Sequence, residues 1–500
     1  MNREKKAAIT SILSIVHQIT TIVCGFILPR FFLANYGSGV NGLISSITSF
    51  LGFISLAECG VGAVVRAALY KPLAQKDNEE LSRIICSAER FFKRIALILL
   101  VYSFILMIVY PNIVIKDFSY VYTASLIVII SISTFAQYYF GITYKLLLAS
   151  DQRGYISLAI QSVSRVANVV LCIVLMKVGA QIHIVKFVSS LIFLFQPLAM
   201  CYIGRHQYSL NRKIGYEGEP ISQKWNGLAQ HIASVVLSNT DTVVLTLFST
   251  LENVSIYAVY GLVVNGVKQL VDSLTMGVQA LFGNMLAKNQ MDQLDRSFGW
   301  FEWFMHTMTA LMFGVTSVLI VPFVAVYTRG ITDVNYIVPV FGAMMTIAQG
   351  CYCVRLPYSI LILTAGHFRQ TQGSAIIEAL INIVFSIFLV NQFGLIGVAI
   401  GTLLAMLYRT IYFAIYLSKN ILFRKIKYFI KHCVVDTIMV VGIVSVNSLV
   451  TCKPNTYVEW IVLAAICTTL ALLIVVVVNY VFYRDELKMS VNVISKKIKR

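Results

Sequence analysis

The feature that most constrains this chain is a series of fourteen long apolar runs separated by short polar breaks. A helix that crosses a membrane needs about 20 mostly apolar residues. The runs are continuously apolar and lack the alternation of a membrane β-strand. They lie at 8–34, 40–69, 94–112, 119–148, 155–177, 183–204, 226–249, 254–287, 299–327, 336–363, 373–390, 394–418, 432–450 and 457–482. The sequence therefore predicts an all-α polytopic membrane protein with about 14 transmembrane helices.

The composition excludes most soluble classes of protein. Hydrophobic residues make up 58% of the 500 residues and charged residues only 12%, whereas a soluble domain has about 25% charged residues. A water-soluble fold of this size has no room to bury that excess of apolar surface. The ten cysteines fall mostly inside apolar runs and lack the partners of a zinc site. We therefore expect no disulfide framework, no metal site and no cofactor.

The positions of the basic residues indicate the orientation in the membrane. The formal net charge is +18, and Lys and Arg collect in the cytoplasmic loops of membrane proteins. With the N-terminus inside, 29 of the 40 Lys and Arg residues fall in cytoplasmic segments, 4 fall outside and 7 lie in or beside spans. We expect both termini on the cytoplasmic side of the membrane. Topology explains the basic charge, and no nucleic-acid partner is expected.

An internal repeat relates the two halves of the chain. The segment NVVLCIVL at 168–175 matches NIVFSIFL at 382–389 without a gap, at an offset of 214 residues. The same offset aligns Tyr138 with Tyr352, Tyr144 with Tyr358, Leu147 with Leu361, and His17 with His231. Six spans per repeat give two parallel six-helix lobes related by a pseudo-two-fold axis along the membrane normal, an arrangement typical of transporters.

The repeat predicts the domain organisation. We expect an N-terminal lobe at 1–210, a cytoplasmic linker at 211–225, a C-terminal lobe at 226–425, two additional transmembrane helices at 426–485 and a basic cytoplasmic tail at 486–500. The predicted outer loops are very short, which argues against an external catalytic domain. The chain also contains no G-x-x-x-x-G-K-[ST] loop of the kind that binds nucleotide phosphates. An ion gradient or the substrate's own gradient therefore has to drive transport.

Ionisable residues inside the spans are the candidate site residues, because a charge at membrane depth costs about 2.5–3.5 kcal/mol and by default faces a cavity. They are Arg30, Glu58, Arg66, Arg165, Lys186, Asp241, Lys268, Asp272, Glu302, Arg355, Glu378 and Arg409. Cations that line a cavity suit an anionic substrate, and the guanidinium fork binds phosphate oxygens bidentately. The predicted substrate-binding cations are Arg30, Arg66, Lys268 and Arg355.

These cations have alternative interpretations. Arg30 follows Pro29 near the end of its span, where an interfacial anchor is as good an explanation, and Arg66 closes a span beside a basic loop. Lys268 and Asp272 are four residues apart and have the spacing of a self-neutralised pair on one helix face. Arg355 precedes Pro357 in mid-span, where snorkelling is difficult, which makes it the strongest candidate for a cavity cation.

The candidates for ion coupling, or for partners of these cations, are three of the embedded acids and two histidines. They are Asp241, Asp272, Glu378, His17 and His231. Asp241, within SNTDTVV, is the best candidate for a buried carboxylate. His17 and His231 occupy equivalent positions in the two halves and are candidates to face each other. A lone histidine in an apolar helix is, however, usually hydrogen-bonded packing.

The first two spans resemble the opening of polysaccharide transporters in the multidrug/oligosaccharidyl-lipid/polysaccharide exporter superfamily. The stretch is LPRFFLANYGSGVNGLISSITSFLGFISLAECGVGAVVRAA. The family pattern has an Arg that ends the first span, a Tyr-Gly pair, and a Gly-rich segment that ends in Arg. Here these are Arg30, Tyr36-Gly37, Gly60-Val61-Gly62 and Arg66. The segments SNTDTVVLTLF and VSIYAVYGLVV are similar to the family's seventh and eighth spans. Family members usually carry a Leu-Gly pair before the Tyr-Gly pair, and this chain has Leu33-Ala34-Asn35 instead.

The resemblance covers essentially the whole chain. It implies a flippase that moves undecaprenyl-diphosphate-linked oligosaccharide repeat units from the cytoplasmic to the outer leaflet by alternating access, for capsule, exopolysaccharide or O-antigen synthesis. The implied partners are that lipid-linked substrate, membrane lipids and, as candidates, a polysaccharide polymerase and glycosyltransferases. The alternatives are an ion-coupled drug or metabolite antiporter of the same superfamily and a membrane-embedded polysaccharide polymerase or ligase. In the flippase and antiporter interpretations the protein is not an enzyme.

Overall fold

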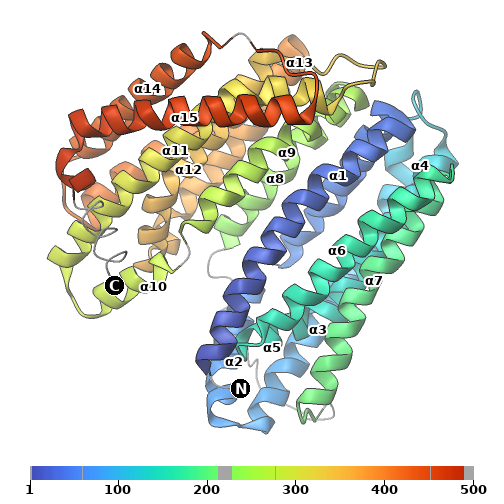
Figure 1. Cartoon of the computed structure of the whole chain (residues 1–500). Coiled ribbons are helices and arrows are strands. Elements are labelled where there is room, and N and C mark those ends of the chain that lie inside the picture. Colours follow the sequence, from blue (N-terminus) through green and yellow to red (C-terminus); the bar gives the residue numbers. More distant parts are fainter. Residues whose placement is uncertain (1–2, 59, 212–227, 276, 451, 489–500) are drawn as a thin grey trace. The chain divides into compact units, whose positions relative to one another are not determined.

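The computed structural model describes residues 3–58, 60–211, 228–275, 277–450 and 452–488, and over these residues it is helical without strands (Figure 1). Twelve of its helices are long and apolar enough to cross a membrane. Two of the twelve, α1 and α13, are each a pair of helices joined at a kink. Counting both halves of these two gives fourteen spans, so the prediction of an all-α polytopic membrane protein is confirmed.

The chain forms two compact units, residues 1–239 and 240–500. In the first unit α6 packs on α1 and α7, and α4 packs on α3 and α7. Its elements are α1 (Arg3–Gly52), η1 (Phe53–Glu58), α2 (Val61–Gln75), α3 (Asn78–Ile113), α4 (Tyr120–Ala136), the π-helical turn η2 (Gln137–Gly141), α5 (Ile142–Ser150), α6 (Gly154–Lys177) and α7 (Ile182–Gln207).

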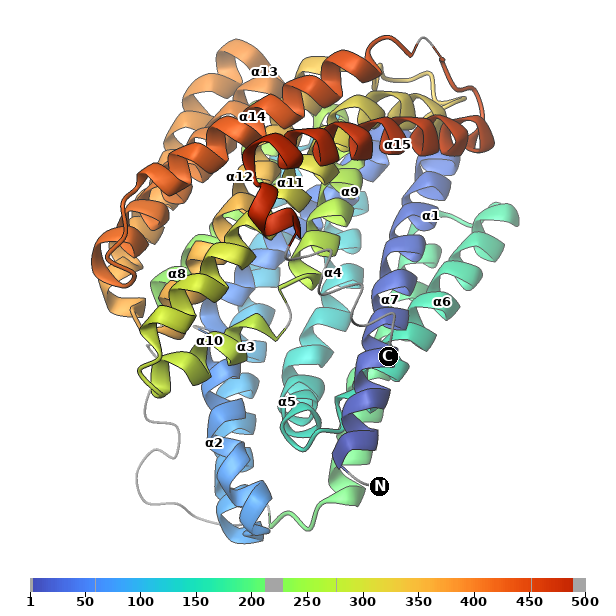
Figure 2. The same ribbon diagram turned by 60° about the vertical axis from the view of Figure 1, so that its left-hand side comes forward.

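The second unit begins inside α8 (Leu228–Phe248). Its other helices are α9 (Leu251–Ser273), α10 (Val278–Ala287), α11 (Met291–Tyr327), α12 (Pro339–Thr364), α13 (Phe368–Asn420), α14 (Lys427–Asn447) and α15 (Tyr457–Phe482). Helix α12 packs on α11 and α13, while α14 and α15 pack on α11 and on each other (Figure 2). Of the predicted linker and tail, residues 212–225 and 489–500 lie outside the described residues.

Glycines in the left-handed region make the two kinks. Gly37 has φ 79° within α1 and Gly394 has φ 54° within α13. Positive φ strains residues that carry a Cβ atom, so glycine is the residue that turns a helix here at least cost. Each kink separates two runs that the sequence predicts as different spans. The labels α1 and α13 therefore each cover two helices and two crossings.

The same tyrosine–glutamate hydrogen bond occurs in both units. The hydroxyl of Tyr144 on α5 donates to Oε1 of Glu89 on α3 at 2.5 Å. In the second unit the hydroxyl of Tyr358 on α12 donates to Oε1 of Glu302 on α11, also at 2.5 Å. The two tyrosines are a pair that the repeat aligns, and the glutamates are 213 residues apart. A shared bond at equivalent positions agrees with the internal repeat.

Buried polar contacts fasten the last two helices to the second unit. The indole of Trp303 on α11 donates to Oδ1 of Asn479 on α15 at 2.7 Å. Nδ1 of His306 on α11 lies 2.5 Å from Oδ2 of Asp436 on α14. Beyond α15, the hydroxyl of Tyr483 lies 2.6 Å from Nδ1 of His432. Burial raises the pKa of Tyr483 above its ordinary value, so this phenol stays neutral.

Candidate functional site

One buried carboxylate in the second unit is held between two guanidiniums. Glu378 on α13 is fully buried and forms ion pairs with Arg355 on α12 and Arg409 on α13. Both arginines are 6% exposed. The cluster has two positive charges and one negative charge, so a net positive charge lies inside the helices. Arg355, predicted as a cavity cation, is thus ion-paired with Glu378, and this pairing is not visible in the sequence.

Lys268 extends this positive region from α9. Its ammonium lies 3.7 Å from the centroid of the Tyr352 ring, and the guanidinium of Arg355 lies 4.9 Å from the same centroid. Cations over an aromatic face are attracted by the ring quadrupole. Lys268 and Asp272, both half-buried, do not form an ion pair within 4.0 Å in the described part of the chain. The two side chains are not in direct contact, but their charges act on each other, so the self-neutralised pair suggested by their spacing stays a prediction.

Asp241 forms a second, separate site in the second unit. It is 2% exposed, and its carboxylate accepts three hydrogen bonds from neutral groups. The hydroxyls of Tyr257 and Thr402 donate to Oδ2 at 2.8 and 2.6 Å. The amide of Asn382 donates to Oδ1 at 3.1 Å. Asp241 is thus the buried carboxylate that the sequence predicts, and none of the three donors neutralises its charge.

Two carbonyl oxygens near Asp241 are buried without a hydrogen-bond partner among the described residues. They are Oδ1 of Asn382 and Oε1 of Gln349. Gln349 lines a small cavity together with Asp241, Tyr257 and Thr402. Buried polar atoms normally have partners, and hard cations are bound by carboxylate, amide and hydroxyl oxygens. The arrangement is chemically suited to a proton or to a small hard cation such as Na⁺.

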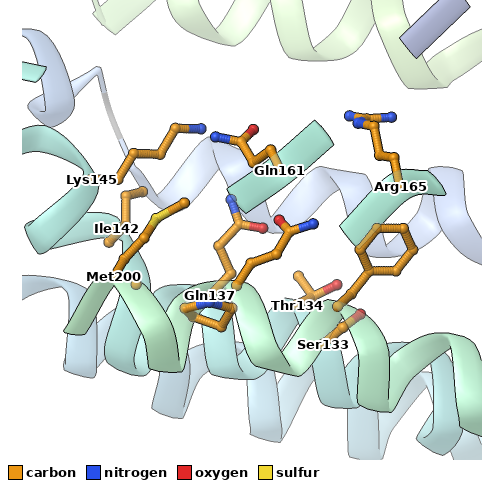
Figure 3. A pocket seen from close by; sticks show the side chains of 12 residues that line it. Ser133, Thr134, Gln137, Ile142, Lys145, Gln161, Arg165 and Met200 are labelled. Carbon is orange, nitrogen blue, oxygen red and sulfur yellow. The ribbon is translucent and has the colours of Figure 1, made fainter. Parts of the chain in front are cut away.

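The first unit contains a polar cavity of about 350 Å³ between α4, η2, α5, α6 and α7. In the view of Figure 3, the charged groups of Lys145 and Arg165 lie along one side of the cavity with Gln161 between them, and Gln137 lies opposite. The sequence counts Lys145 among the cytoplasmic loop residues. In the structure it lies inside α5 and lines the cavity.

The two cations predicted in the first unit do not line this cavity. Arg66 is exposed on α2 and lies within electrostatic range of Lys145. Arg30 is half-buried on α1, directly after the helix-internal Pro29. Their roles in substrate binding therefore remain predictions from the sequence.

The two histidines aligned by the repeat bind different partners. Nδ1 of His17 lies 3.0 Å from the hydroxyl of Ser162 on α6. Nε2 of His231 lies 2.6 Å from the carbonyl oxygen of Ser55. Each bond accounts for a histidine in an apolar helix as hydrogen-bonded packing.

Sequence reasoning did not single out several residues of these sites. Arg165 and Arg409 appear only among the embedded charges, and Asn382 appears only as the first residue of a repeat segment. Thr402 and Gln349 were not considered at all. Their polar amide and hydroxyl side chains stand out inside apolar runs of the sequence. The sequence does not show, however, which of these side chains contact each other in the fold.

Comparison with known proteins shows the fold. No protein-family model matches the chain, and no curated protein sequence matches it. The solved structure of the lipid II flippase MurJ in an inward closed conformation matches with a TM-score of 0.71 and 16% identity, over 96% of this chain and 99% of that one.

A multidrug resistance MATE family transporter of the MOP superfamily matches in two conformations. Its inward-facing structure gives a TM-score of 0.58 at 13% identity, over 80% of this chain and 95% of that one. Its outward-facing structure gives 0.58 at 12% identity, over 84% and 97%. The chain is thus a multi-pass membrane protein with the fold that these flippase and transporter structures share.

Proposed function

We propose that this protein is a flippase that moves undecaprenyl-diphosphate-linked oligosaccharide repeat units from the cytoplasmic to the outer leaflet by alternating access. The supporting observation is the buried, net positive cluster of Arg355, Arg409 and Glu378, joined by Lys268. Embedded cations of this kind suit a substrate whose charged head group is a diphosphate. The fold likeness to a lipid II flippase agrees with a lipid-linked substrate.

In this proposal the protein lies in a bacterial inner membrane with both termini in the cytoplasm, and Arg30 and Arg66 contribute to head-group binding with Lys268 and Arg355. The export serves capsule, exopolysaccharide or O-antigen synthesis, in which a polymerase and glycosyltransferases act on the same lipid-linked units.

Asp241 is the proposed site of the coupling ion. Its carboxylate is buried among neutral donors, and the unpartnered oxygens of Asn382 and Gln349 lie on groups around it. Binding of a cation replaces the missing hydrogen-bond partners and neutralises the carboxylate. The coupling ion then favours the transporter conformations in which it binds this site more tightly, and its gradient shifts their populations.

Reconstitution tests both parts of the proposal. The full chain is placed in liposomes with a fluorescent undecaprenyl-diphosphate oligosaccharide, and outward movement is measured by a membrane-impermeant lectin. We expect transport in the wild type, with a rate that responds to a sodium or proton gradient. Asp241→Asn removes the gradient response, whereas Asp117→Asn, at an exposed loop position, keeps it as the matched control. Absence of lipid movement with and without gradients refutes the flippase proposal.

An ion-coupled antiporter for drugs or metabolites is the second candidate. The buried carboxylate of Asp241 and the likeness to MATE structures favour it. In the same liposomes this candidate predicts export of an organic cation that stops with Asp241→Asn, without movement of the lipid-linked sugar.

A further inference from the structure

The cavity of the first unit has a lining of unusual chemistry for a membrane-embedded helix bundle. Two cations, Lys145 and Arg165, share it with three glutamine amides and two hydroxyls. The amides and hydroxyls are Gln137, Gln161, Gln196, Ser133 and Thr134. No carboxylate lines the cavity among the described residues. Its volume of about 350 Å³ falls within the range of about 300–1,000 Å³ that is typical of small-molecule sites.

The two cations have no protein counter-ion in contact. Within the described ranges, neither Lys145 nor Arg165 forms a hydrogen bond or an ion pair with another residue. Glu58 is a carboxylate that acts on Lys145 electrostatically, and it accepts a hydrogen bond from Tyr138. Cations at membrane depth are expensive unless paired or facing a polar cavity. An anionic ligand in the cavity would supply the missing charge.

Two backbone features, a π-helical turn and a close helix contact at a glycine, form part of the cavity wall. The π-helical turn Gln137–Gly141 interrupts the α-helical path between α4 and α5 and contributes two lining residues. Such turns are found frequently at functional sites. A Cβ atom on Gly141 would lie 2.6 Å from the Cβ of Pro197 on α7, so the absence of a side chain keeps the two walls close. The cavity is thus bounded by close helix packing on one side and by polar groups on the other.

We propose that this cavity binds a sugar that carries a carboxylate, that is, a uronic acid residue of the oligosaccharide. This inference rests on the proposed flippase function and specifies the class of its cargo. The guanidinium of Arg165 binds the carboxylate by charge-assisted hydrogen bonds, and the ammonium of Lys145 adds a second positive charge to the same cavity. The amides of Gln137 and Gln161 each offer a donor and an acceptor to the ring hydroxyls. A bare diphosphate would engage the cations and accept from the amide NH2 groups, but it has no hydroxyl groups to donate to the amide oxygens.

Binding to the purified full chain in detergent tests this directly. The probes are a glucuronate-containing disaccharide, the neutral disaccharide cellobiose and inorganic pyrophosphate, each titrated by isothermal calorimetry. We expect saturable binding of the uronate disaccharide that is about tenfold or more tighter than that of cellobiose, because the charged hydrogen bonds are made only with the carboxylate.

Variants on the cavity wall and a matched control locate the site. Arg165→Gln and Lys145→Gln weaken binding of the uronate disaccharide by about tenfold or more and leave cellobiose binding unchanged. Arg165→Lys keeps the charge and retains most of the binding, which separates loss of recognition from loss of folding. Lys177→Gln, at an exposed position at the end of the same helix α6, binds like the wild type.

Two results overturn the proposal. One is an absence of uronate binding, or uronate binding that is unaffected by both glutamine variants. The other is tighter binding of pyrophosphate that is lost in the same variants, which assigns the cavity to the lipid diphosphate.

The flippase proposal is tested separately by movement of a lipid-linked neutral oligosaccharide. If that lipid moves at the same rate in wild type and Arg165→Gln, and a uronate-bearing lipid also moves equally in both, the flippase function stands and the uronate site does not. If no lipid moves but the uronate disaccharide binds through Arg165, the site stands and the flippase function does not.

Discussion

Removing the carboxylate at the centre of the charged cluster should destabilise the protein more than removing either arginine. Glu378 is the only ion-pair partner of Arg355 within the described part of the chain, and it also pairs with Arg409. Glu378→Gln therefore removes the counter-ion of Arg355 and the carboxylate that pairs with Arg409. Breaking a buried ion pair by removing one partner costs about 3–5 kcal/mol, because a buried charge is left uncompensated.

The comparison variant is Arg409→Leu. It leaves Arg355 and Glu378 as a neutral pair and removes the excess positive charge. Replacing a buried charge by an apolar side chain without leaving an uncompensated charge is often nearly neutral. Glu378→Gln should therefore be clearly less stable than Arg409→Leu, although both substitutions break an ion pair with the same cluster.

The assay is thermal unfolding of the purified full chain in detergent, followed by tryptophan fluorescence. For a unit of this size 1 kcal/mol corresponds to roughly 2 °C in Tm, so Glu378→Gln should melt roughly 6–10 °C below the wild type. A Tm for Glu378→Gln within about 2 °C of the wild type would contradict the argument. So would an Arg409→Leu variant that melts as low as Glu378→Gln.

Three further predictions concern packing and caps. In Gly401→Ala the new Cβ would lie 2.5 Å from Oγ and 2.7 Å from N of Ser386, so we expect a loss of about 1–3 kcal/mol by thermal unfolding. Trp303→Phe removes the 2.7 Å hydrogen bond to Asn479 and should cost about 1–3 kcal/mol, with faster hydrogen exchange in α15. Asp77 caps α3 by accepting backbone bonds at 3.1 and 2.9 Å, so Asp77→Ala should cost about 1 kcal/mol and speed exchange in the first turn.

Each of these three predictions has an outcome that contradicts it. A wild-type Tm for Gly401→Ala would mean that the two halves of α13 move apart without cost. Unchanged exchange in α15 of Trp303→Phe would show that the bond does not hold that helix. Loss of exchange protection along the whole of α3 in Asp77→Ala would show an effect larger than that of a cap.

The sequence predicts the spans well because the signal is local. An apolar run of sufficient length has to be a membrane helix whatever its neighbours are. The breaks were equally visible, and the runs 373–390 and 394–418 correspond to the halves of α13 on either side of Gly394. The short polar interval between them, at 391–393, corresponds to the end of the first half, directly before Gly394.

The partners of the charged residues were much harder to predict, because they depend on contacts between helices. Spacing along one helix suggested Lys268 with Asp272, but the ammonium lies over the Tyr352 ring of α12. Arg355 and Glu378 are on different helices, so no periodicity connects them. Lys145 was counted with a loop because a lysine beside a polar break has the pattern of cytoplasmic sidedness.

The bonds that hold α14 and α15 also have a consequence for motion. Trp303, His306 and their partners fasten both helices to α11, so a rigid-body rotation of the second unit carries them along. The internal repeat divides the chain into six crossings, six crossings and two more. Because α14 and α15 move with the second unit, the chain moves as one unit of six crossings and one of eight, counting α8 with the second. In any such rotation the second unit therefore carries two more membrane crossings than the first.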